Sequence, residues 1–134
     1  MQTNWPLFAG AIFGSSSVLL AAYGAHGLEH VFLANPRMRI AYGNAVDFQM
    51  LHSLLLVVLG LTLYIPKFRL PAYLWKMVFL SIILFCLSIY LWVFGGPDWL
   101  GKVTPFGGIA FVLSWLMLIR IIWLNSSSNQ IVPK

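Results

Sequence analysis

Three side chains near residue 26 have the types and the spacing of a metal site. His26, Glu29 and His30 spell the His-x-x-Glu-His pattern of the inverted zinc peptidases. Two histidines four residues apart on a helix can share a zinc ion, with the glutamate as general base. A catalytic zinc also needs a third protein ligand and an open position for water. Asp47 or His52 would have to supply that ligand.

Two features weigh against a zinc peptidase. Gly27 lowers the helix propensity between the two histidines, and the inverted peptidases are built on large soluble domains that this chain does not contain. The sequence also has no Gly-x-Ser-x-Gly elbow, phosphate loop or dinucleotide fingerprint. We therefore expect no bound metal, no cofactor and no enzymatic activity.

The ionisable groups instead suggest a polar cluster at one face of a membrane. All three histidines and all three acids lie toward one end of the predicted helices: His26, Glu29, His30, Asp47, His52 and Asp98. Some of them, with nearby polar residues and glycines, form a candidate ligand-binding cluster: His26, Glu29, Gln49, His52, Thr104, Gly107 and Gly108.

His52 is the most informative member of this cluster because it lies inside an apolar run. A neutral imidazole in hydrocarbon still needs a hydrogen-bond partner. Asp47 is five residues away on the same helix, and helical neighbours are three or four residues apart. We expect the partner to come from another helix, such as the region around His26. His52 then either belongs to a ligand site or only holds the first two helices together.

Helix N-termini add a second possibility at the same face. The second and fourth predicted helices both begin there, with partial positive charge and free N–H groups. Gly107 and Gly108 leave the predicted first turn of the fourth helix without side chains, and basic residues lie nearby in the sequence. The face could receive an anion such as a lipid phosphate. Alternatively, Glu29, Asp47 and Asp98 already neutralise these groups.

The composition indicates the solvent in which these groups lie. Of the 134 residues, 60% are hydrophobic and only 8% are charged, with a mean hydropathy of +0.88. Soluble domains are about one quarter charged, so this chain is predicted to lie in a bilayer. The net charge of +5 is spread between apolar runs. That distribution does not form the clustered basic face of a nucleic-acid-binding protein.

Apolar runs of about 20 residues, the length needed to cross a bilayer, predict one all-α domain over residues 1–134. It is an integral membrane four-helix bundle with spans at about 5–25, 46–65, 73–94 and 105–124. Asn35-Pro36 and Thr104-Pro105 each resemble a capping residue followed by proline at the first helical position. A helix from Pro36 to Ile65 exceeds the hydrocarbon thickness, so its first turns form an amphipathic extension at the start of the second span.

Several residues have expected structural roles. Trp5, Trp75, Trp99 and Trp123 lie near span ends, as interfacial anchors do. The single cysteine, Cys86, is expected to pack as a small hydrophobic residue. The hydroxyls of residues 15–17 are expected to bond back to their own helix. The N-terminal run lacks the basic start of a cleaved signal peptide, so we expect it to be retained as the first span.

Glycines in the first span predict close helix packing. Gly10, Gly14 and Gly24 recur at helical spacing, and the first two form a Gly-x-x-x-Gly pair. The pair could bind a helix of another subunit or a second copy of the chain. It could equally pack inside the chain's own bundle, which is the interpretation that we favour.

The distribution of basic residues predicts the orientation. Lys67, Arg69, Lys76, Arg120 and Lys134 lie on one side of the predicted spans, and Arg37, Arg39 and Lys102 lie on the other. Because basic residues favour the cytoplasmic side, both termini are expected in the cytoplasm.

Four segments, in order, resemble a known family. They are "AAYGAHGLEH", "AYGNAVDFQMLHSLLLVVLGL", "LFCLSIYLW" and "TPFGGIAFVLSWLMLI". This pattern is similar to domain-of-unknown-function family 423, small bacterial inner-membrane proteins similar to the eukaryotic transmembrane protein 256 family. The matching positions are Gly24, Ala25, His26, Gly27, Leu28, Gln49, His52, Thr104, Pro105, Gly107 and Gly108. His30 and Asp47 depart from the pattern. The resemblance implies four transmembrane helices in the inner membrane and no particular activity.

We expect a non-enzymatic accessory or scaffold subunit of a larger inner-membrane complex, since the chain has no soluble mass and few catalytic groups. Its partners would be the lipid bilayer and other membrane subunits or further copies of itself. The alternative is a small-ligand or lipid-binding protein, or a permease, that uses the polar cluster.

Overall fold

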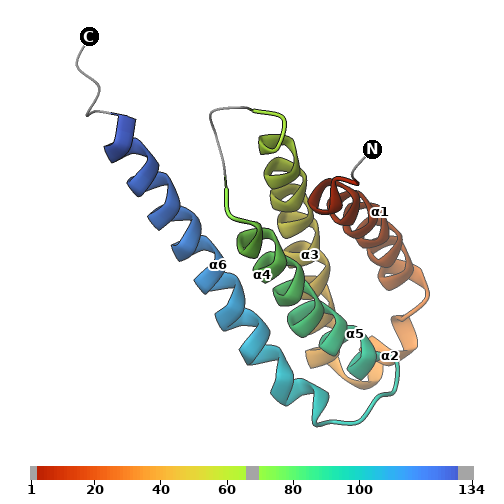
Figure 1. The fold of residues 1–134 in the computed structure, drawn as a ribbon. Helices are drawn as coiled ribbons and strands as arrows, with labels where there is room; N and C mark the ends of the chain where they lie inside the picture. Colours follow the sequence, from red (N-terminus) through yellow and green to blue (C-terminus); the bar gives the residue numbers. More distant parts are fainter. Residues whose placement is uncertain (1–2, 66–69, 130–134) are drawn as a thin grey trace.

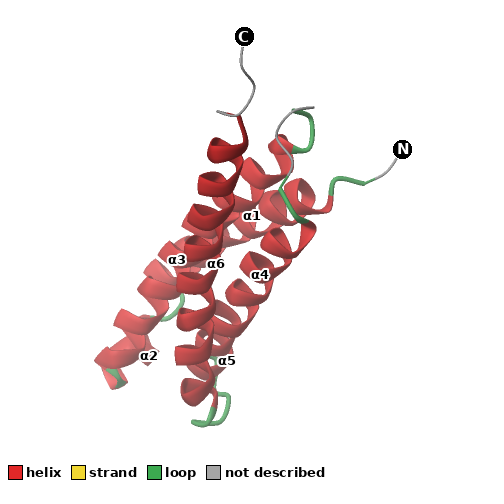
Figure 2. Ribbon diagram, turned by 60° about the vertical axis from the view of Figure 1, so that its left-hand side comes forward, coloured by secondary structure: helices red, strands yellow, loops and turns green. Residues whose placement is uncertain are grey.

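A computed structural model describes residues 3–65 and 70–129, with side chains described up to residue 125, and the described part of the chain is helical between short turns (Figures 1 and 2). The elements are α1 (Trp5–His26), α2 (Glu29–Ala34), α3 (Pro36–Thr62), α4 (Ala72–Ile82), a π-helical segment η1 (Ile83–Leu87), α5 (Ser88–Val93) and α6 (Leu100–Asn129). The segments α4, η1 and α5 follow one another without a break and form one long helix. Cys86 lies buried in η1.

Four helices are long and apolar enough to cross a membrane: Trp5–His26, Pro36–Thr62, Ala72–Val93 and Leu100–Asn125. The all-α membrane bundle predicted from the sequence is therefore confirmed. Within the most apolar stretch of each span, 44% of α3 and of the α4–η1–α5 helix is buried, against 17% of α1 and α6. The second and third spans thus form the centre, and α1 and α6 lie outside them.

The four spans run alternately up and down, which defines two ends of the bundle. Figure 1 shows that α1 begins and α6 ends at the same end. We call this the Trp5 end. We call the opposite end, where α1 ends and α3 begins, the His26 end.

The predicted helix starts are right at one position and wrong at another. Asn35 caps α3, and its side-chain oxygen accepts a hydrogen bond from the Arg37 N–H. Thr104 does not cap a helix, because α6 begins at Leu100 and contains Pro105. The Thr104 hydroxyl instead lies 2.9 Å from the Ser88 hydroxyl on α5. The short helix α2 and the π-helical segment were not predicted.

Helices α1 and α3 touch backbone to backbone through glycines. A Cβ atom at Gly10 would come within 2.8 Å of the Ser53 carbonyl oxygen and the Val57 nitrogen on α3. A Cβ atom at Gly60 of α3 would come within 2.6 Å of the Leu7 nitrogen on α1. The contact therefore depends on the absence of a side chain on both helices.

The other two glycines named from the first span also face α3. A Cβ atom at Gly14 would lie 3.3 Å from the Ser53 hydroxyl, and one at Gly24 would overlap the ring of Tyr42. The structure thus places the Gly-x-x-x-Gly pair inside this chain's own bundle. Two hydrogen bonds tie the same helices together, from Asn4 Nδ2 to the Gly60 carbonyl (2.8 Å) and from the Tyr42 hydroxyl to the Leu20 carbonyl (2.7 Å).

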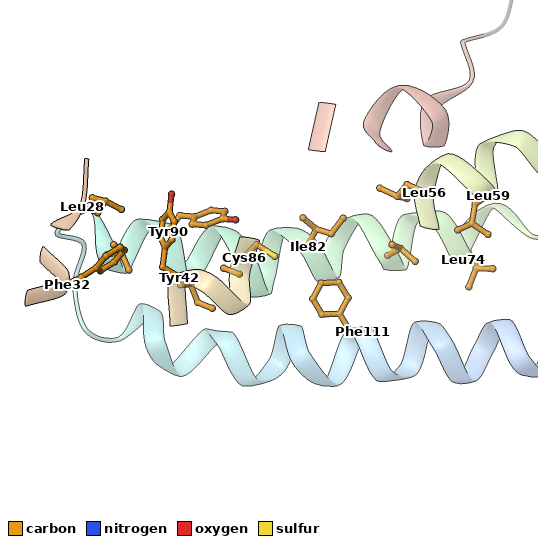
Figure 3. Packing of buried hydrophobic residues seen from close by; sticks show 14 of the residues in the cluster. Leu28, Phe32, Tyr42, Leu56, Leu59, Leu74, Ile82, Cys86, Tyr90 and Phe111 are labelled. Carbon is orange, nitrogen blue, oxygen red and sulfur yellow. The ribbon is translucent and has the colours of Figure 1, made fainter. Parts of the chain in front are cut away.

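Large apolar side chains fill the space between the two central helices and α6. Figure 3 shows Tyr42, Cys86 and Tyr90 toward one end of this cluster and Leu56, Leu59 and Leu74 toward the other. Phe111, which α6 contributes, is only 2% exposed and is directed toward the central helices (Figure 3). This row of contacts attaches α6 to the rest of the bundle.

The glycine contact leads to a matched pair of substitutions in α3. Gly60→Ala should destabilise the protein by about 1–3 kcal/mol, because the new methyl group meets the backbone of α1. Gly43→Ala should be neutral or slightly stabilising, because nothing lies within 4 Å of the Cβ position there and alanine favours a helix. Thermal unfolding of both variants in detergent measures the difference. Equal midpoints would show that the close contact does not stabilise the bundle.

Candidate functional site

His52 is buried at the junction of α3 and α6, with 1% of its surface exposed. Its ring stacks on Phe111 with 3.7 Å between the ring centroids. The Trp115 indole N–H donates to His52 Nε2 at 3.1 Å, and Nδ1 lies 2.8 Å from the Phe48 carbonyl oxygen. Because Nε2 accepts a hydrogen bond, the proton belongs on Nδ1, which donates to that carbonyl. Both nitrogens of a neutral imidazole are satisfied.

The partner of His52 differs from the sequence expectation. A partner on another helix was expected, and Trp115 is one, but the region suggested was that around His26. The neighbouring Ser53 lies opposite Gly14 of α1. Gly14 is twelve residues from His26, which is about 18 Å along a helix. His52 therefore lies near the middle of the span, out of reach of the His26 end.

Gln49 is buried one turn before His52 and binds a different helix. Its amide nitrogen donates to the Phe13 carbonyl at 2.9 Å and to the Ser16 hydroxyl at 2.8 Å, both on α1. The Ser16 hydroxyl in turn donates to the same Phe13 carbonyl. The other hydroxyls of the triple-serine segment also bond to carbonyls three or four residues back, as predicted.

The predicted anion site at the start of the fourth span is not at a helix N-terminus. Gly107 and Gly108 lie in the interior of α6, eight and nine residues into a helix that begins at Leu100. Backbone N–H groups at such positions bond within the helix. A Cβ atom at Gly107 would lie 2.7 Å from Phe85 Cα in η1, whereas one at Gly108 would meet only ordinary contacts at 3.7 Å. Gly107 thus lets α6 approach the π-helical segment.

His26, Glu29 and His30 are exposed at the His26 end. His26 is the last residue of α1, and Glu29 begins α2. Glu29 and Arg39 line a small pocket of about 130 Å³ there. Within residues 3–65 and 70–129, no three His, Cys, Asp or Glu side chains are grouped so that they could hold a metal ion.

The seven residues of the candidate cluster therefore separate into distinct groups. His26 and Glu29 lie at the His26 end, Gln49 binds α1, and His52 binds α6. Thr104 and Gly107 belong to the seam between α6 and the third span, and Gly108 lies beside them. Apart from Gly108, the common feature of the intramembrane members is that they join helices.

Trp115 and Tyr90 are the polar side chains whose importance the sequence did not reveal. The Tyr90 hydroxyl is buried and, among the residues that the structure describes, is the only buried side-chain polar atom without a hydrogen-bond partner. With Gln49 and Cys86 it lines a cavity of about 170 Å³. The unpredicted π-helical segment forms one wall of this cavity, and π-helical turns are frequent at functional sites.

The chain is similar in sequence to a family of bacterial membrane proteins. The model of a family described as "Protein of unknown function (DUF423)" matches residues 20–108. A UPF0382 membrane protein of Staphylococcus haemolyticus is 34% identical over 113 residues, which cover 84% of this chain and 90% of that protein. The UPF0382 membrane protein YwdK of Bacillus subtilis is 32% identical over 114 residues, covering 84% and 91% of the two chains. A UPF0382 membrane protein of Haemophilus influenzae is 33% identical over 110 residues, covering 81% and 85%. No solved structure matches the chain.

The indole–imidazole hydrogen bond can be tested with a double-mutant cycle. Trp115→Phe removes the donor and should cost about 0.6 kcal/mol, and at most about 1.7 kcal/mol, the range measured for hydrogen bonds between membrane helices. In a protein that already carries His52→Leu, Trp115→Phe should lower the free energy of unfolding by a smaller amount. The difference between the two losses is the energy of the hydrogen bond. Unfolding in mixed micelles provides the four free energies. Additive effects of the two substitutions would contradict the bond.

The adjacent glycines of α6 offer a second test. Gly107→Ala should destabilise the fold by about 1–3 kcal/mol, since the methyl group meets the backbone of Phe85, whereas Gly108→Ala should be tolerated. The thermal midpoints of the two purified variants give the comparison. If Gly108→Ala were as damaging as Gly107→Ala, the close approach at Gly107 would not be the cause.

Proposed function

The chain belongs to the DUF423 family of membrane proteins, and we propose that it acts as a non-enzymatic accessory or scaffold subunit of a larger complex in the bacterial inner membrane. The observation that carries this proposal is an exposed carboxylate, that of Asp47, on the outer face of a membrane-spanning helix.

The depth of Asp47 follows from the contact between α1 and α3. Gly60 lies opposite Leu7, near the start of α1. Asp47 is thirteen residues before Gly60, which is about 20 Å along the helix. A hydrocarbon layer about 30 Å thick that begins at the Trp5 end therefore includes Asp47.

Asp47 points away from the bundle. Buried residues of α3, such as Gln49, His52 and Leu56, lie on the opposite side of the helix. Its own side carries the exposed residues Leu51, Leu54, Val58 and Leu61. A carboxylate on a lipid-facing surface is costly, and intramembrane acids normally pair with another group. A neighbouring subunit with a Lys, Arg or amide side chain at this depth would supply that group.

The surface next to Asp47 suits a close helix contact. Gly43 lies one turn earlier and has open space around its Cβ position. Asn44 is also exposed on this part of α3. Small residues let a second backbone approach, and an amide can bond across the interface. We define the outer patch as Gly43, Asn44 and Asp47.

The interior of the bundle supports a structural role over catalysis or transport. Gln49, His52 and Ser88 use their polar atoms to join helices or to bond to their own backbone. A ligand site or permease built on the predicted cluster has less support, because the residues assigned to it lie in separate places. The inner membrane location and cytoplasmic termini remain part of this proposal. They rest on the distribution of basic residues along the sequence, in which Lys67, Arg69 and Lys134 lie outside the described residues.

The proposal is tested by affinity capture of the full-length protein from its native membranes in mild detergent. The wild-type protein should elute with a stoichiometric partner subunit. Asp47→Leu should lose that partner while keeping its thermal midpoint, because a lipid-facing leucine does not disturb the monomer. Leu54→Ala, on the same helix face outside the outer patch, serves as the control and should retain the partner.

Two results would overturn the proposal. One is a wild-type protein that elutes as a lone monomer or only as copies of itself, since an accessory subunit needs a different partner. The other is an Asp47→Leu variant that retains its partner, because the carboxylate would then not be at the interface.

A further inference from the structure

A groove of about 490 Å³ lies between α1 and α4 at the Trp5 end. Aromatic and aliphatic side chains form its walls, chiefly Trp5, Phe8, Ile12 and Phe13 from α1 and Trp75 and Phe79 from α4. Several of these are well exposed, including Phe8 (54%) and Ile12 (49%). The groove therefore opens toward the surrounding lipid.

The groove runs from the membrane surface into the hydrocarbon. Trp5 is the first residue of α1, and Phe13 lies eight residues further along, about 12 Å deeper. Trp75 is in the first turn of α4, and Phe79 is one turn deeper. Tryptophan side chains at both helix starts are typical of the headgroup level, so the mouth of the groove lies there.

Lys76 is the only cation among the described residues that line the groove. Lys76 lines it, is exposed, and holds its ammonium 6.0 Å from the centre of the Trp75 ring. All three acids of the chain lie elsewhere: Glu29 and Asp98 adjoin helix termini at the His26 end, and Asp47 is on the outer face of α3. Among the described residues, no side-chain carboxylate at the same end neutralises the positive charge of Lys76.

The groove is too small for a helix and fits a thinner molecule. A helix is about 10 Å across, so a 12 Å length of helix occupies roughly 900 Å³, nearly twice the volume available. A lipid acyl chain is far thinner than a helix, and acyl chains already surround the protein in a bilayer. An acyl chain leaves its own phosphate at the headgroup level, where Lys76 lies.

We propose that this groove is a binding site for an anionic phospholipid, with one acyl chain along the aromatic wall and the phosphate beside Lys76. Charge complementarity favours an anionic headgroup over a zwitterionic one, because basic residues at a membrane surface attract anionic lipids.

The test uses native mass spectrometry of the purified full-length protein with phosphatidylglycerol or phosphatidylcholine of identical acyl chains. The wild-type protein should bind phosphatidylglycerol more tightly. Lys76→Gln should weaken phosphatidylglycerol binding roughly fivefold, the factor expected for one basic residue at an anionic surface, and should leave phosphatidylcholine binding unchanged. Arg120→Gln removes a cation from α6, which does not line the groove, and should preserve the lipid preference.

The apolar wall is tested separately. Ile12→Ala should weaken the binding of both lipids, whereas Ile109→Ala, at a position on α6 that is at least as exposed (58% against 49%), should not. Equal binding of the two lipids by the wild-type protein would overturn the proposal. An effect of Arg120→Gln as large as that of Lys76→Gln would also overturn it, because the attraction would then be diffuse. No difference between the two isoleucine variants would show that the groove does not hold the chain.

Discussion

The close approach of α1 and α3 at Gly10 and Gly60 is the contact on which the rest of this structure depends. Apolar side chains gain little by leaving lipid for a protein interior, so helices in a bilayer associate through dispersion forces and hydrogen bonds. Both act only at short range. Because the two backbones meet, Asn4 and Gln49 reach carbonyl groups of the opposite helix. The glycines thus position the polar groups that reinforce the contact.

A second seam attaches α6 by the same means. Gly107 lets the helix approach Phe85 in the π-helical segment, and the Ser88 and Thr104 hydroxyls bond beside it. The indole of Trp115 then reaches His52, deep in the span. These polar groups, which would be costly in hydrocarbon without a partner, thereby gain one inside the protein. Most of the buried polar side chains and close-contact glycines thus hold the helices together.

Because the interior polar groups already bond to other helices, the outer surfaces are the places where the protein can interact with other molecules. The outer patch around Asp47 and the groove beside Lys76 lie toward opposite ends of the bundle and differ in chemistry. The patch presents a carboxylate to a position inside the hydrocarbon, whereas the groove presents aromatic rings under a cation at the headgroup level. A helix of another subunit suits the first, and a phospholipid suits the second.

The sequence by itself determined the four spans, the cap at Asn35 and the serine back-bonding, because length, hydropathy and hydrogen bonds within one helix depend only on neighbouring residues. The tertiary structure decided which residues meet across helices. A polar side chain two-thirds of the way along a helix has several possible partners, and the rotation and register set by glycine contacts select one. For that reason Trp115, not the His26 region, binds His52, and Gly60 and Gly107 matter more than their sequence context indicates. The same rotation turns Asp47 outward, where hydrocarbon makes its charge costly and a partner useful.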